Sequence, residues 1–173
     1  MQRAPLLLLL LSTACVNTPD IYAPPTQRKP FVLEAPGPLK HFIAMDDPAA
    51  PAHLMMDVNE RVEAGGGRWT GKRPVLRFRV PTRKHLKLVM DFSFHEVVLK
   101  NTGPITVRFA VNNHVLDTVR YEKDGGHHFE KAIDPSWIHP NGDVLVALEL
   151  NRIFVAPDGA RFGLMLQRAG LLD

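Results

Sequence analysis

A regular alternation of large apolar side chains constrains the fold of this chain more than any other feature. Five apolar residues occupy every second position from Leu86 to Phe94, and four more do so from Ile105 to Val111. A period of two places alternate side chains on opposite faces of a strand. Asn112-Asn113 then predicts a tight turn into a further strand, Val115 to Tyr121. The pattern predicts strands with one buried face, packed as a β-sandwich.

Shorter apolar runs extend this pattern to the C-terminus. They predict strands at 75–80, 128–133, 144–150 and 160–172, a short edge piece at 153–155, and one helical turn at 134–138 that begins with Asp134 as cap and Pro135. No segment shows apolar spacing of 3.6 residues over a helical length. Turn signals every 8–12 residues or so are typical of all-β domains. We therefore predict an all-β jelly roll of about seven to nine antiparallel strands over residues 56–173.

The first fifteen residues are typical of a targeting segment. Arg3 supplies a positive start, Leu6 to Leu11 form an unbroken leucine run, and Ser12-Thr13-Ala14 leads to Cys15, the sole cysteine. The run is too short to span a bilayer, which takes about 20 apolar residues. It fits the apolar region of a signal peptide over residues 1–14.

This start resembles the signal of bacterial lipoproteins, although Ser12 stands where that family usually has leucine. The resemblance implies cleavage before Cys15 and a lipid anchor on its sulfur, which would hold the chain on a membrane. Val16 after the cysteine implies sorting to the outer membrane in enterobacterial lipoproteins, facing the periplasm or the cell surface. The alternative is an ordinary secretory signal with an incidental cysteine.

Residues 15–55 are rich in proline, with eight prolines between Pro19 and Pro51. Proline lacks a backbone N–H and biases the preceding residue toward extended geometry. This segment is therefore predicted to be a tether between the anchor and the domain. His41 to Met45, an apolar stretch within it, is a candidate edge strand of the sandwich.

The order of motifs in residues 56–172 resembles the galactose-binding-like jelly rolls of bacterial carbohydrate-binding modules. The motifs are a tryptophan among basic residues, Leu-x-Leu-x-Met-x-Phe from Leu86, Val-x-Phe-x-Val-Asn from Val107, a proline turn near Trp137, and Phe-Gly-Leu-x-Leu from Phe162. Asn112-Asn113 replaces the usual Asn-Gly turn. The resemblance implies a jelly roll with loops at one rim that are able to bind a sugar, and it does not imply that this chain binds one.

A sugar site needs an aromatic ring and polar side chains at loop ends. The glycine run Gly65–Gly67 predicts a loop around Trp69, and the candidate ligand-binding residues are Trp69, Arg68, Asn112, Asn113, Asn151 and Arg152. The hypothesis expects Trp69, Asn112 and Arg152 to meet at one rim. The alternative is that Trp69 caps one end of the sandwich, because large aromatic side chains are mostly buried.

Other chemistries lack a signature in the sequence. Gly-x-Ser-x-Gly and the phosphate-binding glycine loop are absent, so we assign no catalytic residue. The neighbours His127 and His128 point to opposite sides of an extended chain, and His95-Glu96 lacks a second histidine, so no metal ligand and no cofactor is assigned. Asp57, Asn59 and Glu60 have spacing that would suit calcium. The net charge is only +3, with bases and acids interspersed, which argues against a nucleic-acid partner.

Three functions remain open, in this order. The first is a membrane-anchored, non-catalytic binding lipoprotein that contacts an envelope or extracellular glycan. The second is a structural or assembly lipoprotein that binds another cell-envelope protein. The third is a small glycan hydrolase that uses loop carboxylates or histidines.

Overall fold

The apolar alternation in the sequence becomes the inner face of a sandwich. A computed structural model describes residues 37–81, 85–139 and 142–173. In β4 (Lys87–Phe94) and β5 (Ile105–Val111), the alternating apolar side chains are at most 1% exposed. The predicted strands with one buried face are confirmed. The expected signal peptide, Cys15 and the tether up to residue 36 lie outside the described residues.

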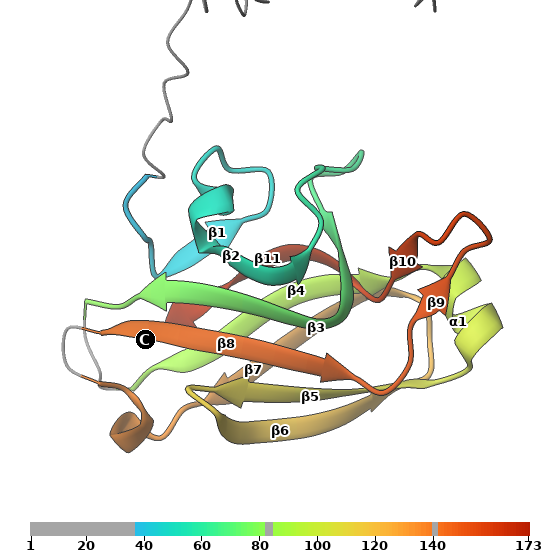
Figure 1. The fold of residues 1–173 in the computed structure, drawn as a ribbon. Helices are drawn as coiled ribbons and strands as arrows, with labels where there is room; N and C mark the ends of the chain where they lie inside the picture. Colours follow the sequence, from blue (N-terminus) through green and yellow to red (C-terminus); the bar gives the residue numbers. More distant parts are fainter. Residues whose placement is uncertain (1–36, 82–84, 140–141) are drawn as a thin grey trace, which may run out of the picture. The chain divides into compact units, whose positions relative to one another are not determined.

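Eleven strands occur in the described residues, and all of them pair antiparallel (Figure 1). Nine form one sheet in the order β6-β5-β8-β3-β11-β4-β7, with β1 paired to β11 and β2 to β3, while β9 and β10 form a separate hairpin. The remaining strands are β1 (Phe42–Ala44), β2 (Leu54–Val58), β3 (Arg68–Arg79), β6 (His114–Tyr121), β7 (Gly125–Ala132), β8 (Asp143–Leu150), β9 (Phe154–Val155), β10 (Arg161–Phe162) and β11 (Met165–Leu172). The predicted all-β class is confirmed.

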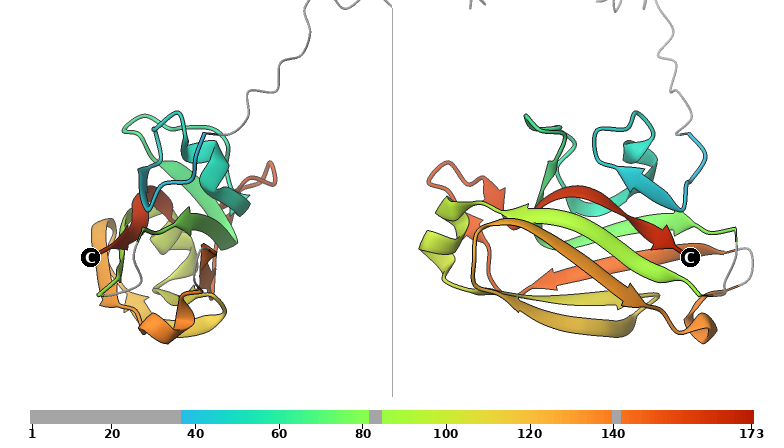
Figure 2. Two further views of the ribbon diagram at one scale, coloured as in Figure 1. Left: turned by 90° about the vertical axis from the view of Figure 1, so that its left-hand side faces the viewer. Right: turned by 180° about the vertical axis from the view of Figure 1, so that it is seen from behind.

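The long strand β3 joins the two layers of this sandwich (Figures 1 and 2). Its second half, Val75–Arg79, pairs with β8, whereas Arg68 and Trp69 pair with β11. Pro74, which has no N–H to give to a ladder, lies where β3 passes from one partner to the other. One layer therefore contains β6, β5 and β8, and the other contains β11, β4 and β7.

The expected loop around Trp69 is wrong, because β3 begins at Arg68 and not near residue 75. Thr70 pairs with Val58 of β2, and Trp69 pairs with Met165 of β11. These partners lie far away in the sequence, and such tertiary pairing overrides a local loop signal.

Helical structure is limited to short segments at the ends of the sandwich. η2 (Pro135–Trp137) confirms the predicted helical turn, with the Asp134 side chain accepting from Ser136 N at 2.9 Å. α1 (Glu96–Thr102) was not predicted, because seven residues are too few for a 3.6-residue period to appear. It is stabilised by a Glu96–Lys100 ion pair at 2.6 Å. No helix in the described part of the chain is long and apolar enough to cross a membrane.

Residues on both sides of the expected boundary at 55/56 contribute to the folded unit. β1 pairs with β11, which confirms the candidate edge strand at His41–Met45. η1 (Ala50–His53) then leads into β2, which pairs with β3.

His53 fixes this N-terminal part of the fold to β3. Its ring is fully buried, with Nδ1 2.8 Å from Arg77 O and Nε2 accepting from Lys40 N at 3.3 Å. Burial lowers the pKa of His53 below its usual 6.5, and the Lys40 and Arg77 charges act in the same direction, whereas the hydrogen bond to Arg77 O opposes them. The neutral ring, with its proton on Nδ1, satisfies both partners.

The free energy of unfolding is therefore expected to depend on pH through His53. A depressed folded-state pKa means that the unfolded chain binds more protons below pH 6.5. The contribution of neutral His53 to the free energy of unfolding is complete above pH 6.5, and it is lost as the pH falls toward the folded-state pKa of His53. Urea unfolding at stepped pH should show a steeper loss for the wild type than for His53→Gln. The exposed His41→Gln variant should follow the wild type, and parallel profiles for all three chains would contradict the prediction.

Candidate functional site

α1 and the β9–β10 hairpin lie at the same end of the sandwich (Figures 1 and 2). Residues of both elements line an aromatic cleft. The cavity has a volume of about 220 Å³. We call it the aromatic cleft and define it by its lining residues, Trp69, His95, Val97, Val98, Phe154 and Phe162. The three large rings are each only partly buried, so the cleft offers aromatic surface to solvent.

Local structure explains how these rings come together. Phe154 and Phe162 pair across the β9–β10 hairpin, and their ring centroids are 6.1 Å apart. Phe162 meets the edge of Trp69 at 5.0 Å. His95 caps α1 by accepting from Val97 N at 3.2 Å through Nδ1, which holds its ring 6.4 Å from Trp69. The cleft is thus built by strand pairing and a helix cap.

A polar trough adjoins the cleft, because Trp69 lines both cavities. Its volume is about 310 Å³, and the polar side chains that line it are those of Asp57, Asn59 and Arg161, because the Thr70 hydroxyl is buried against Leu164. The Asp57 carboxylate accepts from Arg73 N at 2.6 Å and lies 4.0 Å from the Arg161 guanidinium. A Cβ at Gly71 would lie 2.1 Å from Asp57 Oδ1, so the close approach requires glycine.

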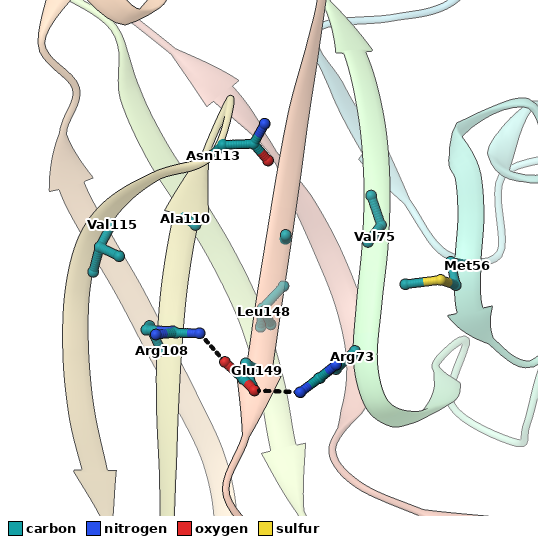
Figure 3. Close-up of a pocket in the computed structure, with 10 residues that line it drawn as sticks. Met56, Arg73, Val75, Arg108, Ala110, Asn113, Val115, Leu148 and Glu149 are labelled. Carbon is teal, nitrogen blue, oxygen red and sulfur yellow. Dashed lines mark hydrogen bonds and ion pairs between the residues drawn. The ribbon is translucent and has the colours of Figure 1, made fainter.

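A third depression, the sheet groove, crosses the outer face of the layer that contains β6, β5 and β8 (Figure 3). Its volume is about 460 Å³. Cross-strand neighbours from five strands form its floor: Met56, Val75, Ala147, Ala110 and Val115. The middle three are small or medium-sized, whereas Met56 and Val115, at the two ends, are each about half exposed.

An ion-pair cluster lies along one side of the sheet groove. Glu149 contacts Arg73 at 3.0 Å and also Arg108, so two guanidinium groups share one carboxylate (Figure 3). Burial acts to raise the pKa of Glu149, but Coulomb attraction to Arg108 and the hydrogen bond from Arg73 outweigh it and leave the pKa below 4.5. Glu149 is therefore ionised at neutral pH.

The structure does not bring the six candidate ligand residues to one rim. Asn112 lies at the η2 end, where its amide donates to Trp137 O at 2.7 Å and its Oδ1 accepts from Leu145 N at 2.9 Å. Trp69 contacts His95 beside α1, at the opposite end. The neighbour of Asn112, Asn113, lines the sheet groove.

The other three candidates mainly hold backbone in place. Arg68 is 4% exposed and donates to Met45 O at 2.7 Å and to Glu60 O. Asn151 Oδ1 accepts from Thr106 N at 2.8 Å, and Arg152 donates to Thr102 O at 2.8 Å. Of the six candidates, only Trp69 lines the aromatic cleft.

Sequence reasoning missed the partners of Trp69. Phe154 and Phe162 flank the Pro157-Asp158-Gly159 turn symmetrically, and a hairpin at this turn would have predicted that the two rings meet. Arg161 and His95 give no such local signal, because they reach the site only through tertiary pairing and a helix cap.

No cluster of three or more histidine, cysteine, aspartate or glutamate side chains suited to a metal ion occurs in the part of the chain that the structure describes. The predicted opposite orientation of His127 and His128 is confirmed. His127 is partly buried and packs against Tyr121 with ring centroids 4.8 Å apart, whereas His128 Nδ1 bonds to Asp91 at 2.7 Å on the outer face.

No protein-family model matches this sequence, and no curated protein matches it. Eight chains of solved structures match. One is a family 35 carbohydrate-binding module from Clostridium thermocellum, 9% identical, with 76% of this chain and 98% of that chain covered and a TM-score of 0.46. Another is a family GH115 4-O-methyl-α-glucuronidase with specificity for decorated arabinogalactans, 9% identical, with 80% of this chain and 18% of that chain covered and a TM-score of 0.44. Both TM-scores are below 0.5, so neither similarity identifies a ligand for this chain.

Proposed function

We propose that this chain is a membrane-anchored, non-catalytic binding lipoprotein whose sandwich domain holds a glycan in the aromatic cleft. The observation that carries the proposal is the position of Trp69, a residue that lines both an apolar cavity and a polar trough. Sugar rings have apolar C–H faces and polar hydroxyl edges, and they need both kinds of surface side by side.

The trough supplies groups of the right chemistry for hydroxyl groups. Arg161 has donors to spare, since its ion pair within the described residues is a 4.0 Å approach to Asp57. Asn59 uses Oδ1 to accept from Arg61 N at 2.9 Å, which leaves its amide N–H groups for a ligand. The Asp57 carboxylate is a hydrogen-bond acceptor. The backbone of Asp57 is in the left-handed region, with φ of 57°.

The non-catalytic part of the proposal follows from the surroundings of the cleft. Glycoside hydrolysis requires two carboxyl groups on either side of the scissile bond. The residues that line the cleft and the trough include one carboxylate, Asp57. The membrane anchor remains a proposal from the lipoprotein-like start at Cys15.

The experiment uses the mature protein purified from cell membranes. Mass spectrometry is expected to find Cys15 acylated, and a glycan array is expected to identify a binding glycan. Trp69→Ala should weaken binding of that glycan by about tenfold or more, since buried tryptophan contacts dominate many binding energies. Trp137→Ala, at the η2 end, is the matched control and should bind as the wild type does.

Three outcomes would count against this proposal. They are an array without any bound glycan, equal binding by Trp69→Ala and wild type, and mature protein with an unmodified Cys15. An empty array together with crosslinking in cells to one envelope protein would favour the structural or assembly role.

A further inference from the structure

The sheet groove carries more positive than negative charge. Arg73 and Arg108 share Glu149, so one guanidinium charge is left uncompensated at this site. Arg77, on the same face of β3, donates to Ala52 O at 2.9 Å and has no carboxylate partner among the described residues. Arg77 is not among the residues that line the sheet groove, so its guanidinium adds a second uncompensated charge beside the groove.

Elsewhere on this face the charges are balanced one to one. Arg79 pairs with Asp143 at 2.6 Å, and Arg120 pairs with Glu122 at 3.0 Å. The positive surplus on this face therefore lies at the sheet groove and at Arg77 beside it. The positive potential is therefore concentrated at one place on this face, and an anionic ligand is expected to bind there.

The shape of the sheet groove suits an extended chain molecule. Its floor crosses five strands, and at about 4.8 Å for each strand spacing it is roughly 19 Å long. The low side chains of Val75, Ala147 and Ala110 leave room above the middle of the floor. None of the ten lining residues is aromatic, so ring stacking cannot supply the binding energy.

We propose that the sheet groove is a second binding site, and that it takes an acidic polysaccharide through the carboxylate groups on its sugar units. Arg73 and Arg108 would bind these carboxylates, because the planar guanidinium fork matches carboxylate geometry. Both side chains remain more than half exposed. Glu149 orients the two arginines and competes with the ligand for them, and Asn113 offers an amide from the β5–β6 turn.

This site shares no lining residue with the aromatic cleft, although the Arg73 backbone N–H donates to Asp57 of the polar trough. Its residues come from the outer faces of β2, β3, β8, β5 and β6, whereas the cleft is formed by α1, β9, β10 and the first residues of β3. Loss of one site should leave the other in place.

The test measures binding of the full chain to polygalacturonate by calorimetry, with fully methyl-esterified polygalacturonate as the uncharged probe of the same backbone. Arg108→Gln should weaken binding to polygalacturonate by about tenfold, the effect of losing one charge-assisted hydrogen bond. Glu149→Gln should strengthen binding severalfold, because the competing carboxylate is removed. The methyl ester should bind to none of the chains.

Arg79→Gln is the matched control, since it removes the same charge from the same face outside the sheet groove. It should leave the affinity within about twofold of the wild type. Trp69→Ala should also bind polygalacturonate normally, which separates this site from the glycan site in the cleft. No binding by the wild type, equal weakening by Arg79→Gln and Arg108→Gln, or weaker binding by Glu149→Gln would each overturn the proposal. Thermal unfolding of each variant confirms that it is folded.

Discussion

Phe92→Ala is expected to lower the free energy of unfolding by about 3–5 kcal/mol, the usual cost of removing a large buried ring. The Phe92 side chain is 1% exposed and lies in the middle of the core. Its ring centroid is within 6.3 Å of four other rings, those of Phe94, Phe109, Tyr121 and His127. These rings come from four different strands, so the cavity could not be filled by a shift of one strand.

Urea unfolding of the wild type and Phe92→Ala would measure this change. Val155→Ala is a suitable control, since that side chain is 54% exposed and its loss should cost less than about 0.5 kcal/mol. A cost below about 1 kcal/mol for Phe92→Ala would mean that the core repacks, or that the two layers are not packed as described.

Arg68→Met is expected to lower the free energy of unfolding by about 2–5 kcal/mol, although the sequence presents Arg68 as a ligand-binding residue. The guanidinium donates to Met45 O and to Glu60 O, and methionine would leave both carbonyl groups without that donor. The bond to Met45 O is buried and the bond to Glu60 O is partly buried, and a buried polar group left unpaired costs about 1–3 kcal/mol. Methionine keeps much of the aliphatic packing, so most of the loss would come from the hydrogen bonds.

Two measurements separate this structural role from a role in binding. The folded fraction of Arg68→Met should bind the array-selected glycan with unchanged affinity, while its urea midpoint falls. Arg73→Met, whose side chain is 66% exposed, should change the free energy of unfolding by less than about 1 kcal/mol. A normal urea midpoint combined with lost glycan binding would return Arg68 to the binding site.

Much of the fold could be predicted because its signals are local. The alternation in β4 and β5 and the cap at Asp134 each lie within a few residues of the structure that they specify. The first half of β3 has no such signal, since its pairing partners are Val58 and Met165. α1 has only seven residues, which is too short for a periodic pattern to appear. It is stabilised by the His95 cap and by one ion pair, Glu96–Lys100.

The candidate binding surfaces are harder to predict, because they depend on contacts between residues far apart in the sequence. Trp69 is a candidate from the sequence because an aromatic side chain among glycines and arginines stands out. Asn112 stands out equally, but the structure uses its side chain to join η2 to β8. The sheet groove depends on register between strands: Arg108 lies opposite Glu149, and that pairing can be known only once the sheet is assembled.

The position of β11 has a consequence for biogenesis. This strand is the last element of the chain, yet it pairs with β3 on one side and with β4 on the other. Until its eight residues have been synthesised, β4 has one unpaired edge over apolar side chains, and β3 lacks partners at Arg68 and Trp69. A chain that stops short of β11 would therefore be prone to aggregation, and a chaperone that holds the unfinished protein would act chiefly on β4.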